Sequence, residues 1–158
     1  MSITTTTTLE TVLDLIRLRL TYLFDTQAAT ASNRVMVVDR LRLQDASVPN
    51  LQIEPLNLQA IGEYTSMNVM VFEYKVHAVV KVELDMGERA KKRMVGDSEK
   101  GAFAWAVRVA DRLIGYKPNT GSEPQSFMRL ENGTHDDVAG LASAAAQFRT
   151  MVRLMNDG

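Results

Sequence analysis

The sequence predicts an α+β fold with a central, mostly antiparallel sheet and two amphipathic helices packed on it. One observation is the segment 69–84, where every even position is apolar and most odd positions are polar or charged. A repeat of two residues is typical of a strand with one face on a core. The other observation is the recurrence of apolar residues every three or four positions in 8–24 and 98–114, the pattern of helices with one apolar face.

Length and composition favour a single domain, 1–158, which is long enough to bury a core of its own. The chain has 18 basic and 19 acidic residues and a formal net charge of -1, so no overall field attracts nucleic acid or anionic lipid. We therefore expect no sequence-specific nucleic-acid partner. No apolar run reaches the roughly 18 residues that span a bilayer, so we expect no membrane partner. The absence of cysteine excludes disulfides and thiolate metal sites.

The N-terminal third is expected to form an arm, a helix and a strand. The polar segment 1–7 is predicted to be a flexible arm, and Thr7 and Glu10 have the spacing of a capping box at the start of the helix. A strand is predicted from Val35 to Leu43, because apolar residues of one parity alternate there with arginines.

The segment 44–68 is expected to be a loop excursion with only a short extended piece. Pro49 and Pro55 lie within it, and proline cannot donate a backbone hydrogen bond inside a central strand. The following strand, 69–84, would extend about 50 Å at roughly 3.3 Å per residue, which is too long for one compact domain to cover. We therefore expect one very long strand that either bends into two or pairs in part outside its own subunit.

A second loop excursion is predicted at 85–97, followed by the second helix. Asp97 or Ser98 can cap the start of that helix, and Gly115 is placed to end it. A short strand is predicted from Ser126 to Glu131, and the pair Asn132 and Gly133 indicates a hairpin turn. A last strand is predicted from Gln147 to Met155, while the alanines at 142–146 fit a strand or a helical turn.

No arrangement of residues in the sequence indicates catalysis. The chain has two histidines, His77 and His135, and no second cluster of ligands completes a metal site around either. No serine lies in a Gly-x-Ser-x-Gly turn, and no glycine-rich phosphate loop is present. The sequence therefore predicts a protein that is not an enzyme and needs no metal or other cofactor.

Charged residues in two places are the candidates for an interface. The loop 85–97 carries a basic cluster between two glycines, and a contact with an acidic surface of a protein partner is expected there. The odd, mostly polar positions of the long strand supply a second set of candidate interface residues. The candidate interface residues are Arg89, Lys91, Lys92 and Arg93 in the loop, and Glu73, Lys75 and His77 on the strand.

The order of these elements resembles the tail terminator proteins of long-tailed, Mu-like bacteriophages. The resemblance is one of pattern and size, covers Leu9 to Met155, and transfers no functional residue. It implies a structural virion protein of the tail and neck, assembled in the host cytoplasm. Such a protein forms a ring, generally a homohexamer, that caps the tail tube and joins it to the neck. The implied partners are further copies of the chain, tail tube and neck proteins, and the sheath.

Two alternatives remain open at this point. The first is another head-tail connector or neck completion protein. The second is a non-catalytic α+β module that binds a small molecule, for which a monomer or dimer with ligand-dependent melting is expected.

Overall fold

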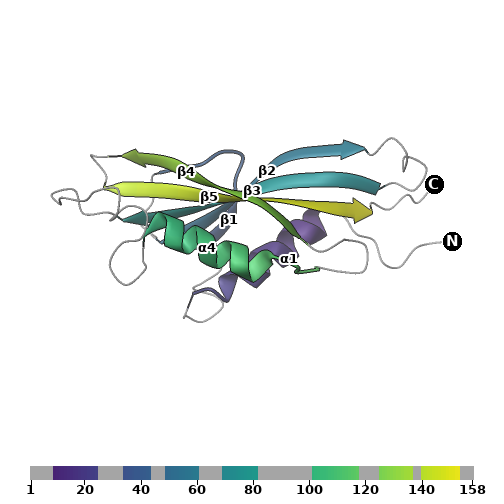
Figure 1. The fold of residues 1–158 in the computed structure, drawn as a ribbon, viewed down its shortest axis with the longest axis horizontal. Coiled ribbons are helices and arrows are strands. Elements are labelled where there is room, and N and C mark those ends of the chain that lie inside the picture. The colour runs from purple at the N-terminus through teal and green to yellow at the C-terminus, as the bar shows by residue number, and fades with distance from the viewer. Residues whose placement is uncertain are drawn as a thin grey trace.

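A computed structural model describes residues 9–24, 34–43, 49–60, 69–81, 101–117, 125–136 and 140–153. They form two layers, a sheet and a pair of helices on one side of it (Figure 1). The elements in chain order are α1 (Leu9–Thr21), β1 (Val35–Val37), β2 (Asn50–Ala60), β3 (Val69–Lys81), α4 (Ala102–Leu113), β4 (Ser126–Asp136) and β5 (Leu141–Arg153).

The sheet has five strands in the order β1-β2-β3-β5-β4. Only the β1–β2 pair is parallel, and the three other pairs are antiparallel. The predicted α+β class with a mostly antiparallel sheet is therefore confirmed. The expectation of one very long strand is not, because β3 and β5 have 13 residues each; residues 82–84 lie outside the described part.

The alternation of the long strand places its even positions on the helix side. Phe72, Tyr74 and Val76 are buried in the core cluster together with residues of both helices. The odd positions are not uniformly wet, since Val79 is buried and His77 nearly so. The period of two therefore predicted correctly which side chains face the helices, while the other face is partly covered as well.

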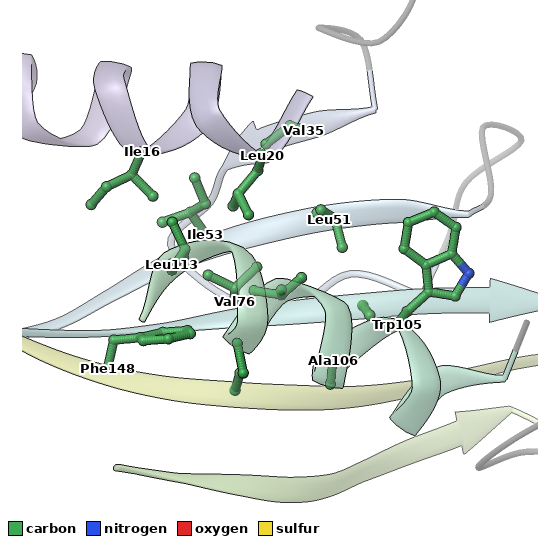
Figure 2. Packing of buried hydrophobic residues seen from close by; sticks show 14 of the residues in the cluster. Ile16, Leu20, Val35, Leu51, Ile53, Val76, Trp105, Ala106, Leu113 and Phe148 are labelled. Atoms are coloured by element: carbon green, nitrogen blue, oxygen red, sulfur yellow. The ribbon is translucent and has the colours of Figure 1, made fainter. Parts of the chain in front are cut away.

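Small residues on β5 let the helix layer approach the sheet. Ala142, Ala144 and Ala146 share the helix-facing side of β5 and are completely buried. Figure 2 shows the core where side chains of α1, α4 and the sheet meet. The alternative left open for the alanines is thus decided in favour of a strand, the one between β3 and β4.

The helices α1 and α4 are held together by reciprocal arginine contacts near their C-terminal ends. Arg19 Nε donates to the carbonyl of Arg112 at 3.1 Å, and Arg112 Nε donates to the carbonyl of Arg19 at 3.2 Å. The last carbonyls of a helix lack partners within the helix. Each arginine thus satisfies one such carbonyl of the other helix, and Arg19 also lies 4.4 Å from the ring centroid of Tyr116.

The structure confirms the predicted end of the second helix but not its predicted start. The N-cap of α4 is Gly101, whereas Asp97 and Ser98 lie outside the described residues. Gly115 follows the C-cap residue Ile114 and has a φ of 76°. This left-handed conformation is the usual end of a helix at glycine, as the sequence predicted.

The prediction of a loop across 44–68 is wrong for the central part of that segment, because β2 occupies Asn50–Ala60. The strand tolerates Pro55 because the neighbouring β1 pairs only with Leu51 to Ile53. Beyond Ile53 the outer side of β2 has no strand beside it among the described residues, so the missing N–H leaves no ladder bond unmade. The register with β3 also shifts between Pro55 and Asn57, which absorbs the distortion as a bulge.

The first strand is shorter than the predicted Val35 to Leu43. It ends at Val37, and the segment that follows is tied to β2 at Arg42. The side chain of Gln52 holds this segment by accepting from the backbone N–H of Arg42 at 2.9 Å and donating to its carbonyl at 2.8 Å. The alternation of apolar residues and arginines continues in the sequence to Leu43. In the structure, however, the backbone of Arg42 bonds to the side chain of Gln52 on β2, and this part of the chain is not a strand.

The hairpin turn predicted at Asn132 and Gly133 is also wrong. Both residues lie inside β4, where the register with β5 shifts between Asn132 and His135. A Cβ at Gly133 would collide with Ser143, whose carbonyl oxygen would be 2.5 Å away. The glycine is thus required by the close approach of β5, not by a turn.

The last two strands are longer than predicted, since β4 runs to Asp136 rather than Glu131 and β5 begins at Leu141 rather than Gln147. The other predictions concern segments outside the described residues. These are the arm 1–7 with its Thr7 cap and the loop 85–97. Within the part of the chain that the structure describes, neither helix has the length and apolar character needed to cross a bilayer.

Candidate interaction surface

The face of the sheet opposite the helices carries charged side chains from three strands. Lys75 and His77 come from β3, Glu54 from β2, and Glu131 and Arg129 from β4. The alternation of β3 that puts Tyr74 and Val76 in the core puts Lys75 and His77 on this opposite face. Glu73 has the same parity, so all three candidate interface residues of the long strand lie on one face of β3.

Lys75 makes an ion pair across the intervening strand β5. Its Nζ lies 2.6 Å from a carboxylate oxygen of Glu131. The register places Glu131 opposite Ala145 and Lys75 opposite Gln147, so the lysine reaches diagonally past a small alanine. The Lys75 hydrogen bond is the main reason that the pKa of Glu131 lies below its usual value. Arg129 Nε adds a second hydrogen bond to Glu131 at 2.8 Å.

His77 is held by a carboxylate on the other neighbouring strand. Its Nε2 lies 2.7 Å from Glu54 Oε1, a diagonal contact because His77 is opposite Gln52 in the register. Glu73, the third strand residue predicted at an interface, lies directly opposite Arg149 of β5. Opposite charges at facing positions of an antiparallel pair are favourable.

These contacts show what the charged face does within one subunit. Lys75 and His77 already have carboxylate partners, and the pairs join β2, β3 and β4 across the sheet. Their role at an interface stays a prediction. The basic cluster Arg89, Lys91, Lys92 and Arg93 lies outside the described residues, so the structure does not place it near this face.

A buried hydrogen bond anchors the start of β4 to the core. The hydroxyl of Tyr74 donates to Gln125 Oε1 at 2.6 Å, and both side chains are almost completely buried. The backbone of Gln125 is fixed too, since its N–H donates to the carbonyl of Tyr116 at 2.9 Å and its carbonyl accepts from Gly115 at 3.0 Å. Burial raises the pKa of Tyr74 well above its usual value.

No group of three or more metal-ligating side chains gathers among the described residues. The side chain of His135 is outside the described part, although its backbone belongs to β4. The charged groups on the sheet instead form two-residue and three-residue contacts of the kind that orient neighbouring strands. The described charged side chains therefore form a surface of paired opposite charges.

Sequence reasoning missed a second feature, the exposed apolar residues on the outer strand β4 and on the part of β2 beyond its pairing with β1. On β2, Leu56 and Leu58 are 40% and 38% exposed, and on β4, Phe127 and Met128 are 38% and 43% exposed. Leu56 and Leu58 were hidden by the expectation of a loop around Pro55. A signal was present in Leu51, Ile53 and the alternation of leucines that follows them, but recognising an edge requires the order of the strands.

Solved structures of other proteins include chains with a similar fold. The fold is similar to that of a chain in the virion of a native gene transfer agent particle, with a TM-score of 0.54 and 14% sequence identity. The likeness covers 89% of this chain and 93% of that chain. At this identity the two chains share a fold. No family model and no curated protein matches the sequence.

Proposed function

We propose that this protein is a structural component of a phage-like virion and has no catalytic role. The observation that carries the proposal is the shared fold with a chain of a gene transfer agent virion, over nearly the whole length of both chains. On the surface of the sheet, the described charged groups form contacts between strands, which suits a structural role.

Within that class, we propose a tail terminator. Copies of the chain form a ring, taken to be a hexamer, on the last ring of the tail tube, and the opposite side of the ring meets the neck. The order of helix, sheet, helix and strands supports this role through its resemblance to such proteins. The sheet supports it as well, because the outer strand β4 and the part of β2 beyond β1 both leave apolar side chains exposed, as subunits that join side by side require.

A small-molecule-binding module is less favoured by the packing. Such a module would keep a pocket between the helices and the sheet. Here Val76, Ala106 and Phe148 are completely buried where these layers meet (Figure 2).

Deletion of the gene in the particle-producing strain tests the proposal. Electron microscopy is expected to show heads separate from tails, and tail tubes of uncontrolled length, because nothing halts tube growth. A plasmid copy should restore particles, and mass spectrometry of purified particles should detect the chain. Tails of normal length that fail to join heads would indicate a neck completion protein instead. Normal particles without the chain would refute the virion role.

A further inference from the structure

We infer that copies of this chain join by antiparallel pairing of the outer edge of β2 in one copy with the outer edge of β4 in the next. The pairing uses β2 from Glu54 to Ala60 and the first half of β4. This inference rests on the proposed function in one respect, since it names the contact by which the ring closes. Edge-to-edge pairing can nevertheless be measured on the protein alone.

The outer edge of β2 is available beyond Ile53. The short strand β1 pairs with Leu51, Gln52 and Ile53 only, and among the described residues no strand lies beside β2 after that point. On such an edge every second residue directs its N–H and C=O outward. Natural edges are usually protected by lysine or other charges, yet the segment from Pro55 to Ala60 carries no charge. Leu56 and Leu58 are instead exposed there.

The strand β4 forms the opposite border of the sheet. Its first residues lie at the same position along the strand direction as the uncovered part of β2. The register joins Pro55, Tyr74, Phe148 and Phe127 in one row across β2, β3, β5 and β4. The exposed apolar residues of the two edges therefore lie close to the same row. Two copies placed side by side would bring Leu58 and Phe127 together with only a small shift along the strands.

The faces also match. Leu58 is opposite Phe72, and Phe127 is opposite Phe148, and both phenylalanine partners belong to the core on the helix side. Leu58 and Phe127 thus project from the same face of the sheet. In a sheet continued from one copy into the next, these side chains would pack against each other on that face.

The strand directions favour the same contact. Three antiparallel pairs lead from β2 to β4, namely β2 with β3, β3 with β5 and β5 with β4, so β2 runs opposite to β4 within one copy. Rotation about an axis roughly parallel to the strands preserves these directions, so β2 and the β4 of the neighbour are antiparallel. Such a head-to-tail contact closes into a ring and covers both edges, whereas pairing β2 with its own copy makes a dimer and leaves β4 open.

Site-specific cross-linking tests the inference, because the chain has no cysteine of its own. Leu58→Cys and Phe127→Cys are made singly and together, and treated with a short thiol-reactive cross-linker. Mixed single variants should give a cross-linked dimer, and the double variant should give a ladder that ends at the ring. The matched control combines Phe127→Cys with Leu18→Cys, which is 50% exposed on α1, and should give no ladder.

The same cross-linking is carried out on purified particles that contain the variants, so that a chain which assembles only on the tube is also tested. Cross-linking of Leu58→Cys to itself would overturn the inference in favour of a β2–β2 dimer. Absence of the mixed product both in solution and in particles would overturn it as well. If those particles have tails of normal length joined to heads, the proposed function stands and only this contact is wrong.

A charge placed on the edge provides a second measurement. Leu58→Lys is expected to weaken self-association about tenfold or more, as measured by light scattering over a range of concentrations, or to reduce incorporation into particles by a similar factor. Leu18→Lys on the helix layer should leave both unchanged. Equal effects of the two substitutions would contradict a role for the edge.

Discussion

Tyr74 shows how a single residue serves both the core and the path of the chain. Its ring stacks between Phe72 and Phe148, with centroids 5.2 Å and 5.4 Å away. Its hydroxyl donates to Gln125, at the point where the chain enters β4. A buried hydroxyl needs a partner, so this hydrogen bond lets an otherwise apolar core hold the start of an outer strand.

Replacing Tyr74 with Phe should destabilise the protein and change its response to alkali. At neutral pH the loss of the buried hydrogen bond to Gln125 Oε1 costs about 0.5 to 1.5 kcal/mol of unfolding free energy. The pKa of Tyr74 is raised in the folded state from its usual value of 10.0. Stability linked to this group is therefore fully present below about pH 10 and is lost as pH rises toward the folded-state pKa.

Urea unfolding followed between pH 7 and 11 measures both effects. The difference between the parent protein and Tyr74→Phe should be largest near neutrality and should shrink above about pH 10. Tyr22→Phe is the control, because Tyr22 is 68% exposed and should behave as the parent does. A difference that stays constant up to pH 11 would show that Tyr74 does not resist ionisation.

The charged residues on the sheet face opposite the helices orient the strands and add little to the free energy of unfolding. The side chains of Lys75 and Glu131 are 24% and 28% exposed, and ion pairs near the surface contribute little to stability. Their value is geometric, because one pair reaches over β5 and a second, between His77 and Glu54, joins β2 to β3.

At the scale of elements, β4 depends on a glycine that lies against the backbone of β5. The strand makes two register shifts along its pairing with β5, between Phe127 and Arg129 and between Asn132 and His135. Bulges of this kind bend a strand and increase its twist. The second shift brings Gly133 against Ser143, where a side chain has no room.

Gly133→Ala is expected to lower the free energy of unfolding by about 1 to 3 kcal/mol, the usual cost of overpacking. Chemical denaturation measures the loss. Adding Ser143→Ala removes the hydroxyl but leaves the Ser143 carbonyl oxygen, 2.5 Å from the new Cβ, so only part of the stability should return. A stable Gly133→Ala protein with unchanged β4 would mean that the two strands lie further apart.

At the scale of the whole molecule, the spacing between the two layers is set by small residues. The helix side of β5 presents three alanines in succession, and α4 contributes Ala102, Ala106 and Ala110 to the same core. Larger residues enter from the neighbouring strands and from α1, which leans against α4 through Arg19 and Arg112. Small side chains in the centre and large ones around it let one helix lie close to the sheet.

Ala144→Leu should therefore be poorly tolerated. Ala144 is completely buried, and three extra carbon atoms there would push α4 away from β5 at a cost of about 1 to 3 kcal/mol in unfolding free energy. Thermal and urea unfolding would report the change. Val107→Leu, at a position of α4 that is 51% exposed, should have almost no effect. Equal stability of both variants would contradict the close packing of the layers.

Periodicity predicted the elements whose burial depends on a single continuous segment. The two helices, the helix-facing parity of β3 and the glycine end of α4 follow from the spacing of apolar residues and from the conformational freedom of Gly115. The same parity placed Lys75 and His77 together on the opposite face. Their partners could not be predicted, because Glu131 and Glu54 lie on other strands and the register that brings them near is set by distant pairing.

By itself, the sequence determined the α+β class, the two helices and the side of β3 that enters the core, since these follow from local alternation of apolar and polar residues. The tertiary structure alone decided that Pro55 lies in a strand, because a proline is tolerated where no neighbouring strand needs its N–H. It also decided that Gly133 faces Ser143 rather than forming a turn. The strand order then left β4, and β2 beyond Ile53, without a neighbouring strand among the described residues, and that order depends on contacts between residues far apart in the chain.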